Sequence, residues 1–159
     1  MRVFLLLAFL SCAAAAAPSR LIVAGGSWAS FDRGRSCEAL AKPLVPVRKQ
    51  EAEPYVAFAF DRGGPRQGQL FAQLRRPVRA GSSVILTVGD RPFQLVARGA
   101  SAWSKDPAQE AAILAALRTA GGMRLVARSA SGRRMSDRFL LDGAPTAIDA
   151  AAAACSLPR

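Results

Sequence analysis

Apolar and polar residues alternate through the middle of the chain, which is the pattern of half-buried strands. The clearest strand is a different kind of run, the continuous apolar and aromatic-rich Tyr-Val-Ala-Phe-Ala-Phe at 55–60, which is followed by the turn residues Asp-Arg-Gly-Gly-Pro. Strands are expected at 27–31, 55–60, 69–74, 83–88 and 92–97. A Gly-Asp-Arg turn joins the last two and predicts a hairpin. The segment 41–54 holds three prolines, so it is a loop or an edge strand.

The periodicity changes at Asp106, where a helix is predicted to begin. Asp106 supplies an N-cap, Pro107 takes the first helical position, and Gln109 is placed to close a capping box. Apolar residues then recur at helical spacing until the glycine pair at 121–122 ends the run.

A second hairpin and a closing helix are predicted downstream. The runs 123–129 and 133–141 flank a Ser-Gly turn, and a helix is expected at 146–154, with Thr146 and Asp149 at capping spacing. The total is six to eight strands and two short helices. Consecutive hairpins without βαβ alternation favour a mainly β (α+β) fold, either an antiparallel β-sandwich or a half-open barrel.

Residues 1–17 are predicted to be a secretory signal peptide, because one positive charge, a short apolar run and small alanines precede a cleavage point after Ala16 or Ala17. The alternative is a lipoprotein acylated at Cys12. The remaining 18–159 has the length of a single domain. It contains no second stretch long and apolar enough for a stable membrane span, so a periplasmic protein is expected.

Removal of the signal leaves two cysteines, Cys37 near the start of the mature chain and Cys155 near its end. An even count in an oxidising compartment predicts a disulfide between them, which would pin the last helix to the first strands. Two free buried thiols are the alternative.

The formal net charge of +11 favours anionic partners such as acidic glycans or lipid head groups. Arg75, Arg76 and Arg79 form a dense basic stretch and are the candidate anion-binding residues. A solvent-facing strand-end loop is the alternative interpretation. Nucleic acid is not expected as a partner, because few aromatic residues are interleaved with the arginines as base-stacking platforms.

No catalytic site is predicted, and neither a cofactor nor a metal site is expected. The chain has no histidine, which removes most catalytic triads and the usual neutral-pH general base. The carboxylates that a hydrolase would need fall where turns or caps explain them; they are Asp61, Asp90, Asp106, Asp137 and Asp142. Trp103 is either a binding aromatic or, more in keeping with its position, a side chain packed over a sheet edge.

Several segments resemble the invasion-associated locus B family of bacterial exported proteins. The segments that carry the likeness are Pro92-Phe93-Gln94-Leu95-Val96, Ala102-Trp103-Ser104-Lys105-Asp106, the run 111–117, Met123-Arg124-Leu125-Val126, Asp137-Arg138-Phe139-Leu140-Leu141-Asp142-Gly143 and Cys155. The chain departs from many members at Arg98-Gly99-Ala100, where a cysteine pair is expected. The resemblance implies a periplasmic or envelope-associated β-rich domain, linked in some members to host-cell invasion.

These observations predict a non-enzymatic exported protein that binds another protein or an anionic envelope component, or that supports the envelope. The alternative is a hydrolase of cell-envelope material that uses acids at hairpin tips. Two carboxylates in a cleft beside Trp103 would favour the hydrolase, whereas arginines of the 75–79 and 133–134 loops on one face would favour binding.

Overall fold

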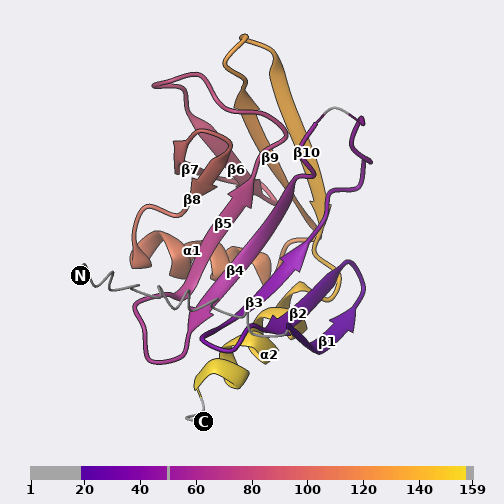
Figure 1. Ribbon diagram of the computed structural model, residues 1–159, viewed down its shortest axis with the longest axis vertical. Helices are drawn as coiled ribbons and strands as arrows, with labels where there is room; N and C mark the ends of the chain where they lie inside the picture. The colour runs from indigo at the N-terminus through magenta and orange to yellow at the C-terminus, as the bar shows by residue number, and fades with distance from the viewer. Residues whose placement is uncertain (1–18, 50, 157–159) are drawn as a thin grey trace, which may run out of the picture.

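A computed structural model describes residues 19–49 and 51–156. In this part of the chain ten strands form one open antiparallel sheet in the order β1-β2-β3-β4-β5-β8-β7-β6-β9-β10 (Figure 1). The elements are β1 Arg20–Gly25, β2 Trp28–Asp32, β3 Ser36–Ala41, β4 Tyr55–Asp61, β5 Gln67–Gln73, β6 Val84–Val88, β7 Arg91–Arg98, β8 Ser101–Trp103, α1 Pro107–Leu117, β9 Gly122–Arg128, β10 Arg134–Leu140 and α2 Ala144–Ser156.

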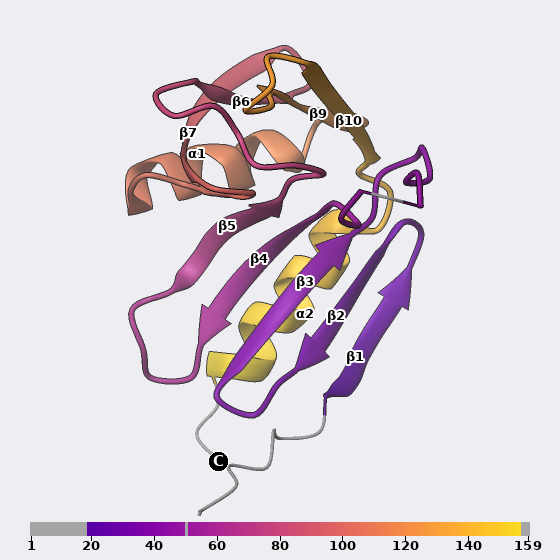
Figure 2. The ribbon, with the colours of Figure 1, turned by 45° about the horizontal axis from the view of Figure 1, so that its top comes forward.

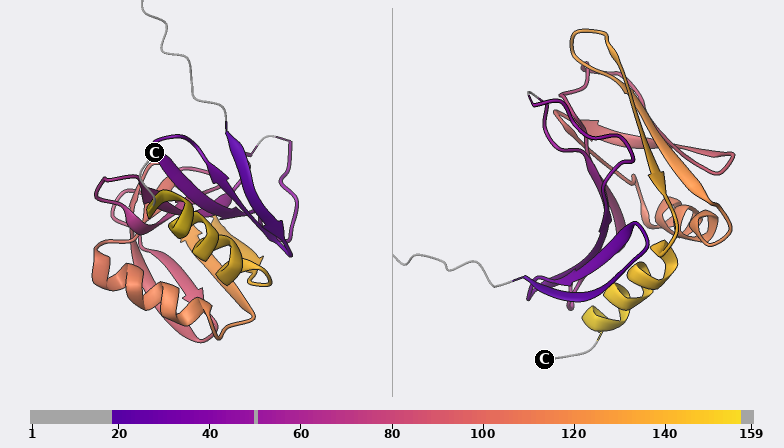
Figure 3. Two further views of the ribbon diagram at one scale, coloured as in Figure 1. Left: turned by 90° about the horizontal axis from the view of Figure 1, so that it is seen from below. Right: turned by 90° about the vertical axis from the view of Figure 1, so that its right-hand side faces the viewer.

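The sheet is strongly curved, and the two helices cover different parts of it. In Figures 2 and 3, α2 lies against β1–β4, and α1 lies at the other end beside β5–β7. A single apolar core joins the two parts, with Trp28 and Phe58 on one side and Phe139 and Leu125 on the other. The predicted mainly β antiparallel fold with two helices is confirmed.

The strands follow the alternation of the sequence. Along β10 the buried side chains are Met135, Asp137 and Phe139, and the residues between them are exposed. Strand β4 differs because its five central residues are all buried, with α2 against one face of its sheet region. The outer face of β9 and β10 is therefore the polar one, and its side chains point away from the core.

Strand β10 is one edge of the sheet, and other segments cover part of that edge. The backbone N–H of Leu44, in the loop after β3, donates to the carbonyl of Arg138 at 2.8 Å. The indole N–H of Trp28 donates to the carbonyl of Leu140 at 2.9 Å. These bonds bring β10 back towards β2 and β3, so the open sheet closes partway on itself.

The sequence underestimates the number of strands, since the structure has ten where six to eight are expected. Strands β1, β3 and β8 account for the difference. β3 (Ser-Cys-Glu-Ala-Leu-Ala) contains weak strand formers but pairs along its whole length with β4 and from Cys37 to Ala41 with β2. Ala41 is the last residue of β3, and the rest of the segment 41–54 is a loop in its described part. The predicted leader 1–17, including Cys12, lies outside the described residues.

The two predicted helices are present, and only the first begins as expected. Asp106 caps α1 by accepting from the N–H of Gln109 at 2.7 Å, and the Gln109 side chain accepts from the N–H of Lys105. α2 begins at Ala144, not at 146. The capping role predicted for Thr146 and Asp149 is therefore wrong, because both lie inside the helix.

Candidate functional site

One arginine of the predicted anion-binding stretch, Arg75, is largely buried and forms an ion pair within the protein. Arg75 reaches under β10, where its Nε lies 2.7 Å and its Nη2 2.6 Å from one carboxylate oxygen of Asp137. The Arg75 side chain is 13% exposed and that of Asp137 only 3%. Nη2 also donates to the carbonyl of Val45, and Nη1 to Glu51 at 3.4 Å. The hydrogen bond that Arg75 donates to the Asp137 carboxylate is the main reason that the pKa of Arg75 is raised.

The other two predicted residues differ from each other. Arg76 donates to Glu51 at 3.0 Å, and this hydrogen bond is the main reason that the pKa of the Glu51 carboxyl lies below its ordinary value; burial opposes it. Arg79 is exposed, and no carboxylate of the described residues lies within 4 Å of it. The structure thus leaves Arg79 open to an external anion, while Arg75 and Arg76 contact carboxylates of the protein. Anion binding by the three together stays a prediction.

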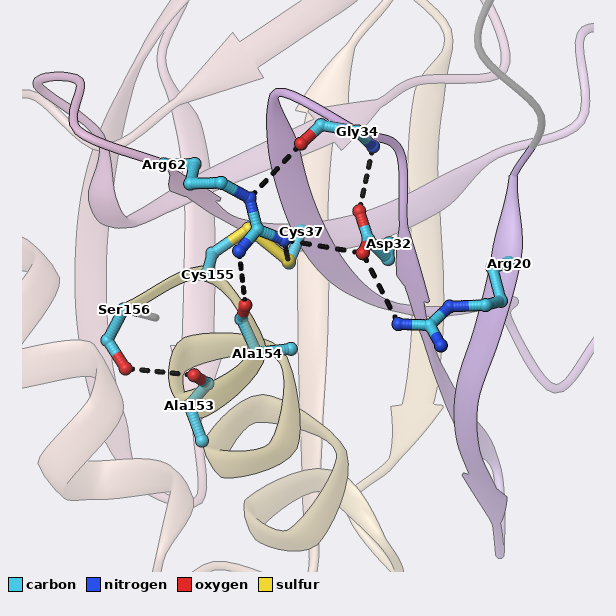
Figure 4. Close-up of polar contacts among 9 residues, drawn as sticks. All are labelled: Arg20, Asp32, Gly34, Cys37, Arg62, Ala153, Ala154, Cys155 and Ser156. Atoms are coloured by element: carbon cyan, nitrogen blue, oxygen red, sulfur yellow. Dashed lines mark hydrogen bonds and ion pairs between the residues drawn. A yellow bond between two sulfur atoms is a disulfide. The ribbon is translucent and has the colours of Figure 1, made fainter. Parts of the chain in front are cut away.

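The structure joins Cys37 of β3 to Cys155 at the end of α2 by a disulfide, the predicted pairing, across a sequence separation of 118. Figure 4 shows Arg62 beside this bridge. Its guanidinium donates to the carbonyl of Ala154 at 2.7 Å and to that of Gly34 at 3.2 Å, and it lies 3.8 Å from the Cys37 sulfur. It also pairs with Asp32 at 3.3 Å. The end of α2 is therefore attached to the sheet by covalent and charged contacts.

Most of the carboxylates considered for hydrolysis have a structural partner. Asp61 binds Arg66, whose hydrogen bond is the main cause of a lowered Asp61 pKa, opposed by burial. Asp106 caps α1, and Asp142 accepts from the hydroxyl of Ser27 at 2.9 Å. The prediction that Asp137 lies at a turn or cap is wrong. Asp137 is buried in the middle of β10, where the ion pair with Arg75 compensates its charge.

An unexpected concentration of positive charge lies on the outer side of β9 and β10. The exposed residues there include four arginines in two cross-strand pairs, Arg124 opposite Arg138 and Arg128 opposite Arg134. Directly opposite residues have Cβ atoms about 5 Å apart. We call the surface formed by these four side chains the arginine face.

The arginine face has no acidic counterpart among the described residues. No carboxylate there lies within 4 Å of any of its four guanidiniums, whereas Asp32, Glu38, Glu51, Glu53, Asp61, Asp106, Asp137 and Asp149 pair with cations elsewhere. The side chain of Arg128 donates to the carbonyl of Gly132 at 3.2 Å. Uncompensated positive charge of this kind attracts anions from solution.

The 75–79 loop runs beside the same hairpin. The N–H of Arg79 donates to the carbonyl of Arg128 at 3.2 Å, and Ala130 donates to Pro77 at 2.9 Å. Arg79 and Arg133, both exposed, therefore belong to neighbouring loops at the turn end of the hairpin. The local density of arginines at 75–79 thus lies next to the arginine face without being part of it. The signal in the sequence for the arginine face itself is the spacing of four between the arginines of each predicted strand.

A surface cavity of about 200 Å³ lies at the other end of the arginine face, where Arg124, Arg138, Leu44 and Leu140 contribute to its wall. No helix in the described part of the chain is long and apolar enough to cross a membrane. No protein-family model, no curated protein and no solved structure matches the chain. The resemblance noted from the sequence therefore stays a prediction.

Proposed function

We propose that this chain is a non-enzymatic exported protein that uses the arginine face to bind an anionic surface of the bacterial envelope. The disulfide fits a protein that leaves the reducing cytosol. The resemblance to the invasion-associated locus B family favours a periplasmic or envelope location. A role in host interaction belongs to the same proposal.

The observation that carries the proposal is the register of β9 and β10, which places two pairs of exposed arginines directly opposite each other. Two arginines directly opposite each other repel, and nothing acidic in the described residues offsets the repulsion. An external phosphate or carboxylate placed between two guanidiniums would remove this repulsion and gain charge-assisted hydrogen bonds. The charge on this surface is thus suited to binding an anion.

The remainder of the fold gives this surface a fixed geometry. The Arg75–Asp137 contact anchors the buried side of β10, and the bond from Leu44 holds its edge. Because β9 and β10 are paired over seven residues, the four outward arginines keep a regular spacing. A paired strand loses less backbone conformational entropy on binding than a loop that carries the same four side chains.

The test compares two variants that each remove two positive charges. Arg128→Ser with Arg134→Ser breaks one cross-strand pair, and Arg35→Ser with Arg48→Ser removes exposed cations elsewhere. Elution from heparin and sedimentation with vesicles containing anionic lipid are measured at about 50 mM salt. The first variant should bind about fivefold more weakly, since two surface charges contribute roughly 1 kcal/mol. Equal loss in both variants would show that net charge alone governs retention and would overturn the proposal.

Export is tested separately by the intact mass of the protein from a periplasmic fraction. The mass expected is that of a chain beginning at Ala17 or Pro18, with both remaining cysteines oxidised. A lipid-modified chain beginning at Cys12 would replace the signal peptide prediction with the lipoprotein alternative. A full-length chain in the cytosol would contradict export altogether.

A further inference from the structure

The arginine face continues into an apolar groove beyond the Arg124–Arg138 pair. The next outward pair along the hairpin is Gly122 opposite Leu140. Because Gly122 has no side chain, the position across from Leu140 is open, and both residues line the cavity of about 200 Å³. The cavity therefore has two cationic groups in one part of its wall and an apolar residue next to them.

Two exposed leucines mark the passage from this cavity to a larger one. Leu44 is 53% exposed and Leu140 is 41% exposed. Both also line a second cavity, of about 540 Å³, that extends along β1–β3 past Ala24, Ala29 and Leu40. Among the described residues, neither wall contains a carboxylate; Lys42 is the further charged residue of the second wall.

We propose that these two cavities form a binding site for one anionic lipid. Its phosphate or carboxylate head lies between Arg124 and Arg138, and its acyl chain passes between Leu44 and Leu140. This inference rests on the function proposed above and names the chemical class of the partner. The Arg128–Arg134 pair then faces the head groups of neighbouring lipids in the same membrane surface.

The site combines a cationic part, formed by the paired arginines, with an apolar part, formed by the exposed leucines, and a lipid matches both parts. Paired guanidiniums suit a phosphate or carboxylate, because each presents a planar set of donors. Binding sites for small ligands are mainly apolar with a few placed polar groups, and the volumes here lie in or near the usual range. A purely polar polyanion would satisfy the arginines but leave Leu44 and Leu140 exposed to water. A lipid would bind the arginines through its head group and cover both leucines with its acyl chain.

The experiment uses dodecyl phosphate, below its micelle concentration, as the probe for titration calorimetry with the oxidised protein. Inorganic phosphate is the control for the head group alone, and dodecyl maltoside is the control with the same alkyl chain and a neutral head group. Dodecyl phosphate should bind at least about tenfold more tightly than either. Affinity should also rise by up to about fourfold for each methylene added between hexyl and decyl phosphate, until the groove is filled.

Gly122→Val tests this site independently of the rest of the arginine face, because the added side chain fills the groove without changing the charge of the protein. A Cβ atom added at Gly122 lies 3.4 Å from the Phe139 carbonyl oxygen and meets no other atom of the described residues within 4 Å, so the backbone has room for a branched residue and the variant should fold. β-Branched residues also suit strands. It should bind dodecyl phosphate at least about tenfold more weakly and keep wild-type retention on heparin. Arg124→Ser with Arg138→Ser should weaken both, and the Arg35→Ser/Arg48→Ser control should keep dodecyl phosphate affinity.

The outcomes distinguish the two proposals. If Gly122→Val binds dodecyl phosphate like the wild type, or if dodecyl maltoside binds equally well, the lipid site is overturned even when heparin retention depends on Arg128 and Arg134. If inorganic phosphate matches dodecyl phosphate, the groove takes no part and the site is overturned as well. If binding to heparin and to vesicles does not depend on the arginines of the arginine face, the proposed function itself is overturned.

Discussion

Reversing the charge at Arg134 should stabilise the free protein while weakening its affinity for anions. Arg134 is exposed on edge strand β10 and lies directly opposite Arg128. Opposite charges in such a position contribute about 0.2–1 kcal/mol, and like charges are destabilising. Arg134→Glu replaces the like-charged pair with an oppositely charged pair. The free energy of unfolding should therefore increase by about 1 kcal/mol, and Tm by roughly 3–5 °C.

The assay is urea unfolding at about 50 mM and about 1 M salt, together with elution from heparin. At 1 M the Debye length falls to about 3 Å, so most of the gain in stability should disappear. Arg134→Gln, which removes the repulsion without adding attraction, should lie between the wild type and Arg134→Glu. Heparin retention should follow the opposite order, with Arg134→Glu eluting first.

Two results would refute this reasoning. A fall in stability for both Arg134 variants would mean that the side chain supports the hairpin, so that the like-charged pair is not the dominant effect. Unchanged heparin retention in Arg134→Glu would mean that the arginine face does not contact the anion. Either result would remove the physical basis of the proposed function.

Three further predictions concern the contacts that hold this surface in place. Replacing Cys37 and Cys155 with alanine opens a loop whose ends are 118 residues apart, so the free energy of unfolding should fall by about 2–5 kcal/mol in urea titrations. Asp137→Asn removes the charge that compensates a buried guanidinium and should cost about 3 kcal/mol in the same assay. The hydrogen bond from Arg66 lowers the pKa of Asp61, so this carboxylate stabilises the fold above its unfolded pKa. The stability difference between the wild type and Asp61→Asn, followed by thermal unfolding, should be constant above about pH 5 and vanish as the pH falls through the folded pKa.

Strong local patterns predicted the parts of the fold whose stability is encoded locally. The run that became β4 and the cap of α1 at Asp106 follow from residue types and spacing alone. The residues of β3 favour strands only weakly, so this strand depends on its neighbours on both sides and cannot be predicted from local sequence. Helix α2 begins two residues before the predicted start, because Thr146 has the chemistry of a cap but not its position.

The basic stretch around Arg75 shows why local charge density was misleading. Its partner Asp137 is 62 residues away, and sequence spacing gives no sign that the two meet. Once β10 is formed, Asp137 points into the core and needs a cation, and Arg75 supplies it. Local density therefore points to two arginines, Arg75 and Arg76, whose charges are compensated by carboxylates of the protein.

The positions of the four arginines on one surface follow from the sequence once the strand register is known. Arg124 and Arg128 are four residues apart, as are Arg134 and Arg138, so each pair shares one face of a strand. The turn between the strands then sets the two pairs opposite each other. Whether these cations remain uncompensated depends on where the eleven acidic residues fold, and most of those bind cations elsewhere. A cationic surface is therefore a property of the tertiary structure, and the net charge of +11 alone locates no site.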